Sequence, residues 1–234
     1  MNAQVQAILE PLHTVDAQRT LRAADPRLAA RVQAVKQYQH RRFQHTYADL
    51  LTQPRYAKAT HFFLEELYGP VDFTRRDAQF KRVIPALVRL FPREVVLTVQ
   101  ALGELHALSE TLDTAMGGKV ADGALAAASY TAAWQAVGRS ADRQQQIVLT
   151  RRVGDALDGY TRNPLLRHSL RLMRTPARLA GMGELQAFLE RGFDTFRDMR
   201  GAAEFLNTVE RREREFAAAL FSGEPVAGRG ALFP

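Results

Sequence analysis

Residues 93–116 read REVVLTVQALGELHALSETLDTAM, and this stretch decides the fold class. Its large apolar side chains recur every three or four positions, at Val95, Val99, Leu102, Leu105, Leu108 and Leu112. At 100° per residue this spacing places them on one face of an α-helix, whereas a half-buried strand would alternate at every second residue. Residues 184–199 show the same period. The sequence therefore predicts amphipathic helices that each bury one face.

The residues around such stretches mark where helices begin. Asp25-Pro26, Asn163-Pro164 and Thr175-Pro176 each place a side-chain acceptor at a helix start and proline at the first helical position. Between these marks no segment has the alternation of a strand. Helices are predicted over residues 3–23, 27–52, 56–68, 73–91, 93–116, 123–137, 141–160, 164–174, 184–199 and 202–221. The predicted fold is all-α, a single compact bundle of about ten helices.

The links between these helices are short, so residues 1–221 are expected to form a single helical domain. Residues 222–234, SGEPVAGRGALFP, are rich in glycine and proline and are expected to form a flexible C-terminal tail. No run approaches the roughly 18 apolar residues that cross a bilayer, and the first residues lack the pattern of a signal peptide. We therefore expect a cytoplasmic protein that does not insert into membranes.

The composition excludes several chemistries. The chain has no cysteine, which rules out disulfides, thiolate metal sites, iron–sulfur clusters and cysteine nucleophiles. The net charge of +7 gives a basic isoelectric point and suggests an anionic partner. The arginines are nevertheless scattered at helical spacing and no basic block occurs. Any nucleic-acid binding is therefore predicted to be weak and non-specific.

Motifs for catalysis and cofactor binding are also sparse. The one Glu-x-x-His spacing, Glu10 to His13, is interrupted by Pro11, whereas di-iron bundles need two such pairs. The sequence contains no nucleophile elbow, no P-loop and no dinucleotide-binding glycine motif. We therefore predict no metal site, and the cofactor remains unknown. These absences make an enzyme less expected without excluding one.

A basic stripe occurs late in the chain at i, i+4, i+7 and i+11, formed by Arg167, Arg171, Arg174 and Arg178. In one continuous helix the stripe would span about 60° of the surface, although Pro176 favours an earlier end. The stripe is a candidate anion-binding face, or it is the solvated side of an amphipathic helix. Segment 36–47 allows the same two interpretations, and in both cases the solvated face is favoured.

The most distinctive stretch runs from His61 to Asp77, HFFLEELYGPVDFTRRD. In the helix that follows Gly69-Pro70, with Asp72 as its expected N-cap, Asp77 projects onto the same face as Phe73 and Ile84. A carboxylate buried there needs a partner. The candidate pocket or network comprises Arg76, Asp77, His106, Glu110 and Asp113. Two interpretations stay open: a ligand-binding polar pocket, and an ion-paired network that fixes the helix register.

The same residues carry a resemblance. The string FFLEELYGPVDFTRRD, followed by VIPALVRLF, resembles a family of uncharacterised bacterial all-helical proteins with an FFLxxLYGPxDFxxRD signature. The resemblance covers about 50 residues. It implies a bacterial, cytoplasmic setting, and it implies no activity, ligand or site residue.

The sequence thus leaves several functions open. The leading hypothesis is a non-catalytic helical domain that binds a protein partner or a small ligand. One alternative is an enzyme that uses the carboxylates and His106 for acid–base or metal-assisted chemistry. Another is weak anion or nucleic-acid binding through the arginine stripe.

Overall fold

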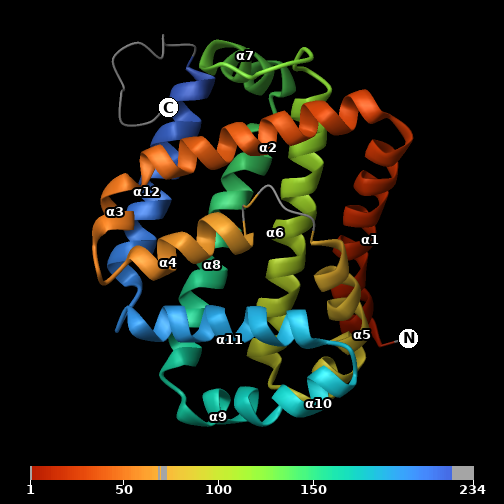
Figure 1. Ribbon diagram of the computed structural model, residues 1–234, viewed down its shortest axis with the longest axis vertical. Helices are drawn as coiled ribbons and strands as arrows, with labels where there is room; N and C mark the ends of the chain where they lie inside the picture. The colour runs from red at the N-terminus through yellow and green to blue at the C-terminus, as the bar shows by residue number, and fades with distance from the viewer. Residues whose placement is uncertain (1, 68, 70–72, 223–234) are drawn as a thin grey trace.

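α6 (Arg93–Gly117) is the long helix around which the others are arranged (Figure 1). The computed structural model describes residues 2–67, 69 and 73–222. In it α6 packs against α1 (Ala3–Ala24), α2 (Pro26–Thr46) and α8 (Ser140–Thr161). α12 (Ala203–Phe221) packs in turn against α8. In Figure 1, α1 and α8 run beside α6 while α2 crosses it.

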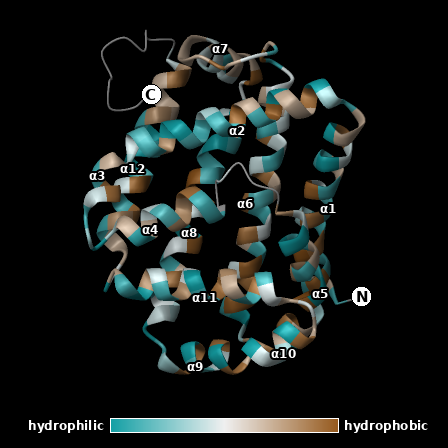
Figure 2. Ribbon diagram, in the orientation of Figure 1, coloured by the Kyte–Doolittle hydropathy of each residue, from teal (hydrophilic) through white to brown (hydrophobic). Residues whose placement is uncertain are grey.

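Shorter helices complete the bundle. They are α3 (Ala48–Thr52), α4 (Ala57–Phe62), the π-helix η1 (Phe63–Leu67), α5 (Thr74–Leu90), α7 (Ala127–Val137), α9 (Pro164–Leu172), α10 (Arg174–Leu179) and α11 (Gly183–Asp198). The described residues contain no strand, so the all-α class is confirmed. Figure 2 shows hydrophobic and hydrophilic residues mixed along each helix, as burial of a single face requires. None of the described helices combines the length and the apolar content that a membrane crossing needs.

The helix boundaries agree with the sequence at some caps and differ at others. Asp25 and Asn163 cap α2 and α9 as predicted, because their side chains accept hydrogen bonds from the first backbone N–H groups. The prediction that Thr175 caps a helix was wrong, since α10 already begins at Arg174. The predicted helix 27–52 is two helices that separate at Tyr47, and the predicted helix 123–137 begins at residue 127. The expected cap Asp72 and residues 223–234 of the expected tail lie outside the described residues.

Two glycines let the central helices approach closely. A Cβ at Gly117 would lie 2.4 Å from Cγ2 of Val32, so α6 meets α2 where only glycine fits. A Cβ at Gly154 would lie 2.4 Å from Cδ2 of Leu206, so that side chain would have to shift to admit a larger residue between α8 and α12. α2, α6, α8 and α12 therefore meet around a shared interior, and that interior contains the polar site.

Candidate functional site

Asp77 lies in the first turn of α5 and is 6% exposed. Its Oδ2 accepts a hydrogen bond from Nη2 of Arg19 at 2.6 Å and lies 2.9 Å from Nε2 of His106. Nε of Arg76 is 4.0 Å from Oδ1 of Asp77, and the Arg76 guanidinium donates instead to the backbone oxygen of Glu66 at 2.8 Å. The prediction that Asp77 is buried and paired, either with Arg76 or with a group from the helix that bears His106, is confirmed, and His106 is the closer of the two. The partner on α1, Arg19, was not predicted.

Opposing effects act on the Asp77 carboxyl. Burial raises its pKa, but the hydrogen bonds and positive charges of His106 and Arg19 outweigh burial and hold the pKa below its usual value. A lowered pKa means that the ionised form stabilises the fold at neutral pH. This contribution is lost as the pH falls through the folded-state pKa. Asp77 is thus held as a carboxylate by its neighbours.

One turn further along α6, Glu110 forms a second cluster. Its Oε2 accepts a hydrogen bond from Arg22, and its Oε1 accepts one from Nζ of Lys36 at 2.5 Å. Burial raises the pKa of Glu110, while the charges of Lys36 and Arg22 outweigh burial and lower it overall. Both carboxylate oxygens are therefore engaged by cations from α1 and α2.

Asp113, 8% exposed, has weaker partners. Its Oδ1 accepts a hydrogen bond from Nε2 of Gln39 at 3.1 Å, and its Oδ2 lies 3.9 Å from Nζ of Lys36. Burial raises the pKa of Asp113, and nearby Glu110 adds to the rise, which Lys36 and Arg143 offset only in part. The surroundings of Asp113 therefore favour its protonated form.

We expect Asp113→Asn to become more stable relative to the unsubstituted protein as the pH rises from 4 to 7. A raised pKa makes the folded state lose stability as the pH climbs from the unfolded to the folded pKa. The neutral amide avoids that loss. Thermal melts of both proteins across this pH range measure the difference in Tm. If the Tm of Asp113→Asn instead falls relative to that of the unsubstituted protein as the pH rises, ionised Asp113 stabilises the fold.

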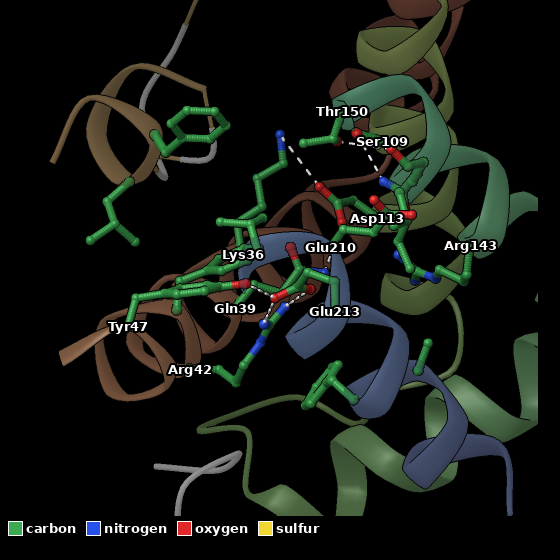
Figure 3. A pocket seen from close by; sticks show the side chains of 18 of the residues that line it. Lys36, Gln39, Arg42, Tyr47, Ser109, Asp113, Arg143, Thr150, Glu210 and Glu213 are labelled. Carbon is green, nitrogen blue, oxygen red and sulfur yellow. Dashed lines mark hydrogen bonds and ion pairs between the residues drawn. The ribbon is translucent and has the colours of Figure 1, made fainter. Parts of the chain in front are cut away.

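A cavity of about 120 Å³ lies between α2, α6, α8 and α12 (Figure 3). His106, Glu110 and Asp113 of the predicted constellation line it, whereas Arg76 and Asp77 are not among its described lining residues. Three of the five predicted residues therefore line the cavity and two do not. Lining side chains with polar groups that were not predicted as site residues are Lys36, Gln39, Arg42, Tyr47, Thr60, Ser109, Tyr130, Trp134, Arg143, Gln146, Thr150, Arg151, Glu210 and Glu213.

Arg42 contradicts the expectation that segment 36–47 presents a solvated face. The favoured interpretation was a solvated face, yet Arg42 is only 4% exposed, so the interpretation was wrong for this residue. Its guanidinium forms two hydrogen bonds with Glu213, at 2.5 and 3.0 Å, and lies 3.8 Å from the ring of Phe43 and 4.1 Å from that of Phe216. The hydroxyl of Tyr47 also donates to Glu213 at 2.6 Å. This pair forms the wall of the cavity between α2 and α12.

The arginine stripe lies away from this cavity, on two short helices. α9 ends at Leu172, so the four arginines do not share one continuous helix. Arg174 pairs with Glu190 at 2.6 Å and Arg167 lies 3.5 Å from Asp194, while Arg171 and Arg178 are exposed. Anion binding by this stripe stays a prediction.

Within the described part of the chain, no group of three or more His, Cys, Asp or Glu residues could hold a metal ion.

Together, the helices and the paired charges define an all-helical domain with a cavity lined by charged, polar and aromatic side chains. The chain belongs to the family described as Domain of unknown function (DUF8198), whose model matches residues 18–227. The matched range includes every residue that lines the cavity. No curated protein and no solved structure matches the chain.

Proposed function

We propose that the protein binds a small polar molecule in the cavity between α2, α6, α8 and α12. The observation that carries the proposal is that charged side chains surround a space of about 120 Å³, buried ones from α2, α6 and α8 and half-buried ones from α12. Charged residues are rarely buried unless they are paired, and a purely structural network gains nothing from a gap at its centre. Pockets between the helices of a bundle are common places for ligands.

The engagement of the acid–base groups favours binding over catalysis. Both oxygens of Glu110 accept hydrogen bonds from cations, and Nε2 of His106 faces Asp77. A general acid or base must instead reach the proton that it transfers. The enzyme alternative rests on Asp113, whose pKa is raised and whose carboxyl is the least firmly paired of these groups.

The resemblance of FFLEELYGPVDFTRRD and the segment that follows it to a bacterial family supports a bacterial, cytoplasmic setting for the protein. We propose that the protein binds nucleic acid only weakly and without sequence preference, because two of the four stripe arginines are already paired with carboxylates.

Thermal melts against a panel of small acids, phosphate esters, amines and zwitterions test the proposal. A ligand at 100 times its Kd stabilises by about 2.7 kcal/mol, which raises Tm by roughly 5–10 °C in a protein of this size. We expect at least one class to give such a saturable rise.

Two substitutions on α6 locate the ligand. Ser109 lines the cavity, so Ser109→Leu fills part of it and abolishes the rise. Thr111, a second hydroxyl residue of α6 outside the described lining, provides the matched control Thr111→Leu, which keeps the rise. An equal rise in both variants would place the ligand elsewhere, and no rise with any class would refute the proposed function.

A further inference from the structure

Several N–H donors in the cavity lack an acceptor. Nη2 of Arg143, Nε of Arg42 and Nε1 of Trp134 are buried and have no hydrogen-bond partner among the described residues. All three side chains line the cavity, and they are 7%, 4% and 6% exposed. Guanidinium and indole nitrogens donate hydrogen bonds and accept none. A molecule in the cavity would therefore have to supply the acceptors that these donors lack.

Contacts between side chains place these donors in one region. The guanidinium of Arg143 lies 3.9 Å from the ring centroid of Trp134, and that of Arg42 lies 4.1 Å from the ring centroid of Phe216. The rings of Trp134 and Phe216 meet edge to face at 5.9 Å. Figure 3 shows Arg42 and Arg143 reaching toward the cavity from α2 and α8. An acceptor-rich group seated there would meet donors from both sides.

One of the cations that line the cavity has no ion pair among the described residues. Lys36 pairs with Glu110 and lies 3.9 Å from Asp113, and Arg42 pairs with Glu213. Arg151 and Glu210 pair with each other at 3.1 Å and add no net charge. The cation without an ion pair is Arg143, whose one described hydrogen bond goes to Oε1 of Gln146 at 3.0 Å.

Resting on the proposed function, we propose that the ligand presents an oxyanion, either a carboxylate or a phosphate, to Arg143 and Trp134. An oxyanion supplies both the missing acceptors and a counter-charge for Arg143, and the planar guanidinium fork matches either group. Water would satisfy the donors but would leave the charge of Arg143 without a counter-ion. Aromatic rings beside the guanidinium groups offer apolar contact to the body of a small organic acid.

Four simple probes test the class of ligand: acetate, inorganic phosphate, methylammonium and acetamide. Melts are recorded at constant ionic strength, and a saturable shift in Tm gives an apparent Kd. Because phosphate also stabilises proteins by exclusion from their surfaces, the criterion is the difference between variants and not the shift alone. Acetate and phosphate together separate a carboxylate from a phosphate as the preferred group.

The variant Arg143→Met removes the unpaired charge and keeps much of the side-chain volume. Arg139→Met is the matched control, because Arg139 precedes the same helix, pairs with Asp142 and is 39% exposed in its side chain. We expect acetate or phosphate to bind the unsubstituted protein and Arg139→Met alike, and to bind Arg143→Met at least ten-fold more weakly. If Arg143→Met does not fold, Arg143→Lys retains the charge but removes the guanidinium, and the same ten-fold loss is expected.

The other outcomes overturn the inference in distinguishable ways. Equal anion binding by Arg143→Met and Arg139→Met would show that the anion lies elsewhere. Binding of methylammonium or acetamide alone would overturn the oxyanion and leave the proposed binding function standing. Failure of all four probes, together with failure of the wider ligand panel, would overturn both.

Discussion

Substitution of Asp77 by alanine is expected to lower the stability of the fold by about 3 kcal/mol. The change strands two groups that converge on the carboxylate, Arg19 at 2.6 Å and His106 at 2.9 Å. Their side chains are 21% and 20% exposed, so water compensates part of the loss and the effect lies at the low end for a broken buried pair. In a protein of this size the change corresponds to a fall in Tm of roughly 6–12 °C.

Two variants complete this experiment. Asp77→Asn keeps the shape and loses the charge, so it is expected to cost less than alanine, about 2 kcal/mol. Asp16→Ala breaks the Lys81 pair between the same two helices, but Asp16 is 50% exposed and the expected loss is below about 1 kcal/mol. The difference between Asp77→Ala and the unsubstituted protein shrinks as the pH falls, because the pKa of Asp77 is lowered in the fold. An unchanged or higher Tm for Asp77→Ala would contradict the structural role.

Glu213→Ala is expected to have the larger effect, a loss of about 3–5 kcal/mol. It leaves the guanidinium of Arg42, which is 4% exposed, without its counter-charge between two aromatic rings. It also removes the acceptor of the Tyr47 hydroxyl. Thermal or denaturant unfolding measures the loss.

The control lies two residues along the same helix. Glu215 is half-exposed and pairs with Arg211 at 3.1 Å on the surface, so Glu215→Ala is expected to change stability by less than about 0.5 kcal/mol. Equal losses from both substitutions would mean that Arg42 finds another partner or water when Glu213 is removed.

The helices were predictable because their signal is local. The 3.6-residue period and the caps at Asp25 and Asn163 depend only on neighbours in sequence. The break at Tyr47 was not predictable, since segment 27–52 contains neither proline nor glycine before Gln53. The short helix α10 was not predicted, because the local sequence signal indicates the wrong start. Pro176 reads as a helix start but lies inside α10, whose beginning at Arg174 has no side-chain cap.

The site was predicted only in part, because its partners come from helices far apart in the chain. Asp77 was identified as a charged residue in phase with an apolar face, and the same test finds the residues that were missed. On α1 the buried stripe Val5, Ile8, Leu12 and Val15 continues at the same spacing to Arg19 and Arg22. On α12 the stripe Leu206, Val209, Phe216 and Leu220 includes Glu213 in the same phase. These patterns predict burial, whereas the identity of each partner depends on tertiary packing.

The pairing of Arg42 with Glu213 also has a consequence for biosynthesis. The two residues are 171 positions apart, so α2 has emerged from the ribosome long before its counter-charge on α12 is translated. Until then the aromatic surroundings of Arg42 are incomplete as well, since Phe216 arrives with the same helix. A nascent chain therefore lacks the interactions that make burial of Arg42 favourable, and α2 stays hydrated on that face. During synthesis the Arg42–Glu213 wall of the cavity consequently forms only after α12 has left the ribosome.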